Sequence, residues 1–310
     1  RRKTQTRLQQ IPQAPVSALP VSTIQAWVMA ARPQTLPAAV APVLLGSALA
    51  FSQSKGNLPA ALVALLGAMC IQIATNLAND YWDAKKGADT ADRLGPVRVT
   101  ASGLIKPRSV FIGMVIFFVI ATVGGIFLTL RAGWPVIAIG TASILFGILY
   151  TAGPFSLAYL GLGEVFTFLF FGLVATAGTY FVQALSFSPE ALWLGVMPGC
   201  YSVVLIALNN LRDRESDQRV NKKTLAVRFG EKFARIEILL FLFIPSFVPL
   251  IVLEFHGGGW LCAMAAFLSA LRVGGPIVRL RDPRVINDLF PHAGISSLFL
   301  AILVSVFLLM

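Results

Sequence analysis

The chain has 310 residues, of which 56% are hydrophobic and 13% are charged, and its formal net charge is +11. Soluble domains carry about 25% charged residues, so the composition excludes an ordinary soluble protein. Several apolar runs of about 20 residues are long enough to cross a bilayer as helices, and the sequence lacks the alternating pattern of a membrane β-barrel. We therefore expect an all-α polytopic membrane protein. Its positive charge fits cytoplasmic loops that face anionic lipid, and nucleic acid is not an expected partner.

The sequence predicts a basic, flexible tail over residues 1–22, followed by a single transmembrane domain over residues 23–310. A short interfacial helix over 22–31 would place Trp27 at the depth of the lipid headgroups. Nine transmembrane helices, packed around a central cavity, account for the apolar runs. Their predicted ranges are about 33–52, 59–79, 109–130, 134–151, 162–183, 191–210, 234–254, 259–277 and 291–310.

An odd number of spans puts the two termini on opposite sides of the membrane. With nine spans, 23 of the 25 Lys and Arg residues fall on one face, and the other face carries only Lys55 and Arg131. Basic residues concentrate on cytoplasmic loops, so we expect a cytoplasmic N-terminus and a C-terminus outside. The spans 59–79 and 191–210 then both end at the cytoplasmic face, where the polar segments that follow them can face each other across one cavity.

These two polar segments contain paired carboxylates. Asp80 and Asp83 are three residues apart, and Asp213 and Asp217 are four apart, so each pair would share one face of a continuing helix. Mg²⁺ or Mn²⁺ binds through one or two carboxylates together with substrate phosphates. Interleaved Lys and Arg residues are suited to phosphate oxygens. We therefore expect the four aspartates to be catalytic, by holding a magnesium-bridged diphosphate. The alternative for either segment is a solvated, salt-bridged loop.

Several longer motifs occur at these positions and at other helix ends. They are 32–37 (RPQTLP), 79–83 (NDYWD), 86–90 (KGADT), 93–96 (RLGP), 150–154 (YTAGP), 161–164 (GLGE), 209–217 (NNLRDRESD) and 223–226 (KTLA). On these motifs the chain resembles the UbiA superfamily of intramembrane aromatic prenyltransferases, over nearly its whole length after about residue 25. Within that superfamily it is most similar to the 1,4-dihydroxy-2-naphthoate prenyltransferases of menaquinone and phylloquinone synthesis. The broad superfamily motif NDxxDxxxD would put a third aspartate at Gly87, whereas the next one here is Asp89, a spacing typical of the naphthoate branch.

The resemblance implies transfer of a prenyl group from an allylic prenyl diphosphate to 1,4-dihydroxy-2-naphthoate. Diphosphate and CO₂ would be lost, and the product would be of the demethylmenaquinone or demethylphylloquinone type. The expected cofactor is Mg²⁺, with Mn²⁺ as a substitute. The expected location is a bacterial inner membrane or an organelle membrane. Two alternatives stay open: a related prenyltransferase with another aromatic acceptor, and, in a different class, a membrane transporter or cation channel.

The motifs also imply roles for individual residues. The predicted metal ligands are Asp80, Asp83, Asp89, Asp213 and Asp217. The predicted diphosphate ligands are Asn79, Lys86, Arg93, Arg98, Arg212 and Lys223. The candidates for the wall of the substrate cavity are Arg32, Asn76, Tyr150 and Asn209. For Arg32 and Tyr150, a simple place at the membrane interface is the competing interpretation.

Overall fold

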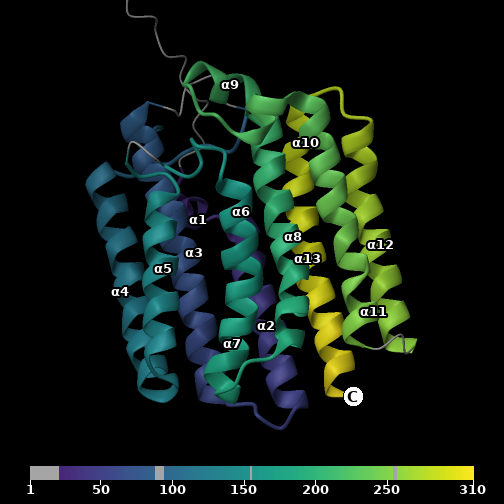
Figure 1. The fold of residues 1–310 in the computed structure, drawn as a ribbon. Coiled ribbons are helices and arrows are strands. Elements are labelled where there is room, and N and C mark those ends of the chain that lie inside the picture. Colours follow the sequence, from purple (N-terminus) through teal and green to yellow (C-terminus); the bar gives the residue numbers. More distant parts are fainter. Residues whose placement is uncertain (1–20, 88–93, 154–155, 254–256) are drawn as a thin grey trace, which may run out of the picture.

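The computed structural model of the chain describes residues 21–87, 94–153, 156–253 and 257–310. Every regular element in these ranges is a helix or a helical turn. Figure 1 shows the long helices side by side in one bundle, with a short helix, α9, at one end and the C-terminus at the other. The α-helices are α1 (Thr23–Ala31), α2 (Pro37–Ser52), α3 (Leu58–Lys86), α4 (Pro107–Ala132), α5 (Trp134–Leu149), α6 (Gly163–Phe168), α7 (Ala175–Ala184), α8 (Pro189–Arg212), α9 (Arg214–Arg219), α10 (Leu225–Phe243), α11 (Val248–Val252), α12 (Gly257–Val278) and α13 (Ile286–Leu309).

Seven helical segments of the described chain are long and apolar enough to cross a bilayer. The pair Thr23–Thr35 and Pro37–Ser52, bent by 51°, adds an eighth if it forms one span. The remaining predicted span corresponds to α5, which is apolar but has only 16 residues. The structure therefore confirms an all-helical polytopic protein, while the count of nine spans and the orientation stay predictions.

The first predicted span is interrupted by a hinge. α1 ends at Ala31, because the φ of 52° at the next residue, Arg32, is left-handed and cannot continue the helix. A 3-10 turn, Pro33–Thr35, follows, and α2 begins only at Pro37, four residues later than predicted. The hinge is held against α3, because Thr35 Oγ1 accepts a hydrogen bond of 3.0 Å from Asn76 Nδ2. It thus brings Arg32 to the same end of the bundle as the polar part of α3.

Helices α3 and α8 continue past their predicted apolar limits into the polar segments. α3 runs to Lys86 and stops at Gly87, whose φ of 67° is a left-handed helix cap. Lys85 and Lys86 in its last turn oppose the negative end of the helix dipole. α8 runs to Arg212, and after Asp213 the chain enters α9. The first aspartate pair therefore lies on a regular helix, and the second spans a junction between two helices.

The centre of the bundle is α8, in which 78% of the apolar window is buried, against 39% or less in the other long spans. Small residues allow this close packing. Gly195 and Gly199 face the π-helical turn Leu169–Val174 (η2) between α6 and α7, where a Cβ on Gly172 would lie 2.6 Å from Gly199 Cα. Close helix packing at small residues is typical of membrane bundles. Because α8 is surrounded on all sides, the position of its polar end is fixed by the rest of the fold.

The span predicted over 234–254 starts earlier, at Leu225, because Thr224 Oγ1 caps the helix by accepting a hydrogen bond from the Val227 amide at 3.3 Å. A kink at Gly230, with a φ of 84°, separates this first turn from the rest of α10, which begins with Glu231, Lys232 and Arg235. The prediction left residues 225–233 in a loop because the basic residues on both sides of them are typical of a cytoplasmic segment.

Candidate functional site

A polar cavity of about 400 Å³ lies where α3, α8 and the hinge after α1 meet. One face of α3 forms its first wall. Gln72, Asn76, Asn79 and Asp83 all line the cavity, and their spacing of four, three and four residues places them on one helical face. The wall therefore changes along its length from amide side chains at its inner end to a carboxylate at its outer end.

Asp80 lies off this face. Its Oδ2 accepts hydrogen bonds from the Thr100 amide at 3.3 Å and from Thr100 Oγ1 at 3.2 Å, and its side chain does not line the cavity. Asp83 therefore lines the cavity and Asp80 does not, and the role of Asp80 as a metal ligand stays a prediction. Asn79, four residues before Asp83, is the nearest residue of α3 that lines the cavity beside it.

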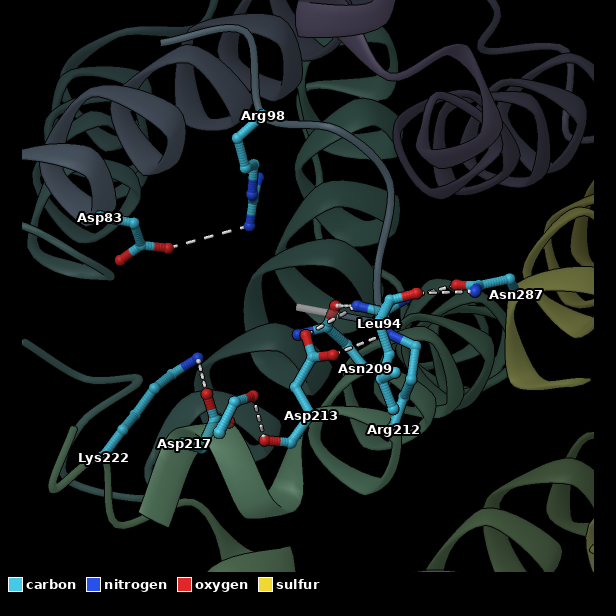
Figure 2. Close-up of polar contacts among 10 residues, drawn as sticks. Asp83, Leu94, Arg98, Asn209, Arg212, Asp213, Asp217, Lys222 and Asn287 are labelled. Carbon is cyan, nitrogen blue, oxygen red and sulfur yellow. Dashed lines mark hydrogen bonds and ion pairs between the residues drawn. The ribbon is translucent and has the colours of Figure 1, made fainter. Parts of the chain in front are cut away.

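The second wall is formed by the end of α8, by α9 and by the turn after it. Asp217 lies one helical turn after Asp213, since its amide donates to the Asp213 carbonyl at 2.8 Å. Lys222 Nζ lies 3.3 Å from Asp217 Oδ1. Figure 2 shows Asp213, Asp217 and Lys222 facing Asp83 and Arg98 across the cavity. The two segments that the sequence placed at one end of the bundle are thus brought together.

Arg212 organises this second wall. Its Nε and Nη2 donate to the two carboxylate oxygens of Asp213 at 2.8 and 2.7 Å. Nη2 also donates to Asn209 Oδ1 at 2.6 Å, and Nη1 donates to Asn287 Oδ1 at 3.0 Å. The side chain is 1% exposed, and its guanidinium lies over the ring of Phe290. Arg212 was predicted to bind diphosphate, but in this structure its donors are directed at protein acceptors, so its geometry favours holding Asp213 in place.

The charges of the second wall influence one another strongly. Burial raises the pKa of Asp217 to about 6, helped by the charges of Asp213 and Asp83 and opposed by Lys222. Burial also works against the charge on Lys222, but the three aspartates outweigh it, and the pKa of Lys222 lies above its usual range. Carboxylates that raise one another's pKa in this way form a region of negative potential, which a cation would neutralise.

The predicted basic ligands divide into three groups. Arg98 lines the cavity, and its Nη2 lies 3.8 Å from Asp83 Oδ2. Lys86 is not part of the cavity lining, although both it and Lys222 lie over the Tyr159 ring, and its Nζ donates to the Thr151 carbonyl at 2.6 Å and to Ser156 Oγ at 3.1 Å. Lys223 is exposed, whereas Lys222 lines the cavity. Of these adjacent lysines, the structure therefore favours Lys222 over the predicted Lys223 as the one near a bound diphosphate, and no feature of the sequence distinguishes the two. Asp89 and Arg93 lie outside the described residues.

All four candidates for the cavity wall, Arg32, Asn76, Tyr150 and Asn209, are found there. Asn76 also has a structural task, because its Nδ2 donates to the Ala31 carbonyl at 2.9 Å and so fixes the hinge. Asn209 is engaged by Arg212. Beside it, Asn210 lines the cavity and donates to the buried Glu164 Oε1 at 2.7 Å. Lys222, Gln72 and Asn210 were not predicted, and only the helical spacing from Asn76 and Asn79 could have indicated Gln72.

An apolar chamber of about 210 Å³ continues from the polar cavity toward the other end of the bundle. The two share five lining residues, Ala38, Thr75, Tyr150, Thr167 and Phe171. Gly67, Gly125 and Gly140 line the chamber, and a Cβ on any of them would meet no other atom within 4 Å. Tyr150 therefore stands at the junction between a charged compartment and an apolar one.

The donor set fits a divalent cation that is held jointly with a substrate. Asp83 Oδ1 and Asp217 Oδ2 are buried without a hydrogen-bond partner, one on each wall. In the part of the chain that the structure describes, no three His, Cys, Asp or Glu side chains come together closely enough to hold a metal ion by themselves. Mg²⁺ typically uses one or two carboxylates and completes its octahedron with phosphate oxygens and water, which matches this arrangement.

Fold and site together define a multi-pass helical membrane protein with a polar cavity between two carboxylate-bearing walls and an apolar chamber beside it. Comparison with known proteins gives the family. Residues 39–303 match the UbiA prenyltransferase family, and the chain belongs to that family. It is thus an integral membrane protein, as the sequence predicted.

Two curated relatives carry the same name, 1,4-dihydroxy-2-naphthoate octaprenyltransferase. The one from Mycobacterium tuberculosis is 36% identical over 279 residues, covering 90% of this chain and 95% of the relative. The one from Escherichia coli is 37% identical over 221 residues, covering 69% and 72%. Among solved structures, a UbiA homolog from Archaeoglobus fulgidus bound to DMAPP and Mg²⁺ shares the fold with a TM-score of 0.64. That structure is 14% identical and covers 92% of this chain and 99% of its own.

The adjacent lysines provide a matched pair of variants. Lys222→Met removes the ammonium group that faces the cavity and three carboxylates, so we expect turnover to fall about 100-fold, the usual effect of deleting one preorganised cation. Lys223→Met removes an exposed charge one residue away and should leave turnover close to wild type. Initial rates of the two purified variants, with equal folding checked by size-exclusion chromatography, test the assignment. A greater loss in the Lys223 variant would show that the cavity is lined differently.

Proposed function

We propose that the protein transfers a prenyl group from an allylic prenyl diphosphate to 1,4-dihydroxy-2-naphthoate, with release of diphosphate and CO₂. The observation that carries this proposal is the pair of buried, unpartnered carboxylate oxygens on opposite walls, Asp83 Oδ1 and Asp217 Oδ2, beside an apolar chamber. One diphosphate between the walls and one prenyl chain in the chamber would occupy both compartments. The names of the curated relatives support the naphthoate acceptor, and their bacterial origin supports a bacterial inner membrane.

Some side chains of the two walls would bind the metal ion, and others would bind the diphosphate directly. Mg²⁺, or Mn²⁺ in its place, would supply positive charge that stabilises the leaving diphosphate. Asn79 and Asp83 from α3, and Asp213 and Asp217 from the second wall, are the proposed ligands. Lys222 and Arg98 would bind the outer phosphate oxygens directly. Because these groups are held rigidly before substrate arrives, they stabilise the developing charge without further reorganisation.

The reaction itself takes place at the junction of the two compartments. The C–O bond of the donor breaks and its electron pair leaves with diphosphate, giving an allylic cation. The electron-rich naphthoate ring supplies the electron pair of the new C–C bond, and the carboxyl group leaves as CO₂. Arg32, on the hinge, lines the cavity and would bind the acceptor carboxylate before it is lost, and Tyr150, at the junction, would lie between the two substrates. The apolar chamber excludes water from the allylic cation.

Two alternatives are less well supported. A transporter or cation channel would place its carboxylates along the span, whereas these lie at one end of the bundle beside basic residues, and family membership favours the enzyme. Another branch of the family would use the same diphosphate site with a different aromatic acceptor. The relatives' names favour the naphthoate, and the acceptor panel below separates these branches.

We propose further that the chain crosses the membrane nine times around the central cavity, with its N-terminus in the cytoplasm. Residues 1–22 would form a flexible tail and residues 23–310 one transmembrane domain. Support comes from the concentration of Lys and Arg on one predicted face, which requires α5 and the bent α1–α2 pair each to span. A phosphatase reporter, active only outside the cytoplasm, is therefore expected to be active when fused after Met310. Activity of a cytoplasm-specific reporter at the same position would instead mean an even number of spans.

The proposed activity is tested with purified protein, octaprenyl diphosphate, Mg²⁺ and naphthoate labelled in its carboxyl group. We expect labelled CO₂ and a prenylated naphthoquinol in equal amounts, with both lost on addition of EDTA and restored by Mg²⁺ or Mn²⁺. Asp83→Asn and Asp217→Asn should each lower the rate by about 100-fold or more, because each removes one wall's charge from the same diphosphate. Transfer to 4-hydroxybenzoate, chlorophyllide or haem in place of the naphthoate would overturn the acceptor assignment.

A further inference from the structure

A third element, α13, also reaches the second wall, through Phe290 under the Arg212 guanidinium and through the hydrogen bonds of Asn287 in its first turn. Asn287 Oδ1 accepts a hydrogen bond from Arg212 Nη1 at 3.0 Å, while Asn287 Nδ2 donates to the Leu94 carbonyl at 2.9 Å. Both ends of the amide are therefore hydrogen-bonded. Their partners, Arg212 and Leu94, precede Asn287 in the sequence by 75 and 193 residues. Figure 2 shows Asn287 next to Leu94 and Arg212, on the side away from Asp217.

The segment that Asn287 holds, residues 94–106, covers the cavity and is called the strap below. Pro96, Val97 and Arg98 of the strap line the polar cavity. Its far half is fixed to the first wall, because Val99 and Ile105 are buried in an apolar cluster with α1, α3 and α4. Thr100 adds two hydrogen bonds to Asp80. The near half crosses to the second wall, where Leu94 meets Asn287.

Contact between the strap and Arg212 is close enough to require a glycine. A Cβ on Gly95 would lie 2.5 Å from Arg212 Nη2 and 2.8 Å from Arg212 Cζ. The guanidinium has little freedom to move away from such a Cβ, because it forms an ion pair with Asp213 and stacks over the ring of Phe290. The strap backbone, Arg212 and Asn287 therefore form one packed unit at the mouth of the cavity.

We propose that Asn287 is a positioning residue, which sets the distance between the two walls by fixing the strap on Arg212. Through Arg212 it orients Asp213, and through Leu94 it places Arg98, so that cations and carboxylates from both walls meet one diphosphate. This role rests on the proposed function only in requiring a diphosphate substrate. It does not depend on which acceptor is used, and Asn287 need not touch either substrate.

Two substitutions separate the two hydrogen bonds of Asn287. Asn287→Asp keeps an acceptor for Arg212 but loses the donor to Leu94, whereas Asn287→Ala loses both. We expect kcat/KM for the prenyl diphosphate to fall about 10-fold or more in each, as for loss of a well-aligned polar contact, with the larger loss in Asn287→Ala. The KM of the acceptor should stay near its wild-type value. Asn57→Asp is the control, since an aspartate there still accepts the cap bond from the Ala60 amide at the start of α3.

Strap position is measured independently by brief trypsin digestion in detergent. Arg98 is 10% exposed, so the bond after it should be protected in the wild type, and inorganic diphosphate with Mg²⁺ should increase the protection. In both Asn287 variants the cut after Arg98, identified by mass spectrometry, should appear early, while the thermal unfolding midpoint stays at the wild-type value. This readout needs no turnover, so it stands even if the naphthoate proves not to be the acceptor.

The proposal fails if both Asn287 variants keep wild-type kcat/KM for the donor. It also fails if the loss comes with a lower unfolding midpoint and cuts throughout the chain, since Asn287 would then be an ordinary packing residue. Should neither variant fold, Gly95→Ala disturbs the same contact from the strap side and should expose Arg98 with the same loss of kcat/KM. Unchanged protection and kinetics in a folded Gly95→Ala protein would equally overturn the role.

Discussion

Burying carboxylates at the end of a membrane helix bundle is unfavourable, and the arrangement of this protein follows from the opposite charges that offset this burial. Asp83, Asp213 and Asp217 are each less than 10% exposed, and two of them retain a buried oxygen with no hydrogen-bond partner. Removing charge from water without a partner costs several kcal/mol, so such groups persist where an opposite charge completes them. Arg212, Lys222 and Arg98 supply part of that charge. The remainder is suited to a divalent cation and a bound diphosphate.

The bundle makes this site by fixing the ends of two helices. α8 is buried along most of its length and packs at glycines against η2, so its polar end has little freedom to shift. α3 extends past its apolar part because Lys85 and Lys86 favour its last turn. The strap and the hinge after α1 then close the sides of the cavity. Apolar packing and close helix contact thus hold the carboxylates of the two walls near one another, although their like charges repel.

Much of this could be predicted from the sequence, and the failures have identifiable physical causes. The apolar runs and the distribution of Lys and Arg indicated the class of fold, and the two aspartate segments indicated the end of the bundle at which the site lies. Spacing alone could not decide which side of α3 faces inward, and Asp80 was placed in the cavity although it binds Thr100. Likewise, Lys222 and Lys223 differ only through the turn after α9, whose direction depends on tertiary contacts. Asn287 carries no local signal, because its two partners lie far away in the sequence.

The central claim is that the two walls hold one diphosphate between them. Its most direct test is calorimetric titration of inorganic diphosphate with Mg²⁺ into the wild-type protein, into Asp83→Asn and Asp217→Asn, and into the double variant. Residues that grip one ligand together give strongly non-additive losses. We therefore expect each single variant to lose most of the binding and the double variant to lose little more. Losses of binding free energy that simply add would mean that the walls bind separate ligands, and would contradict the account.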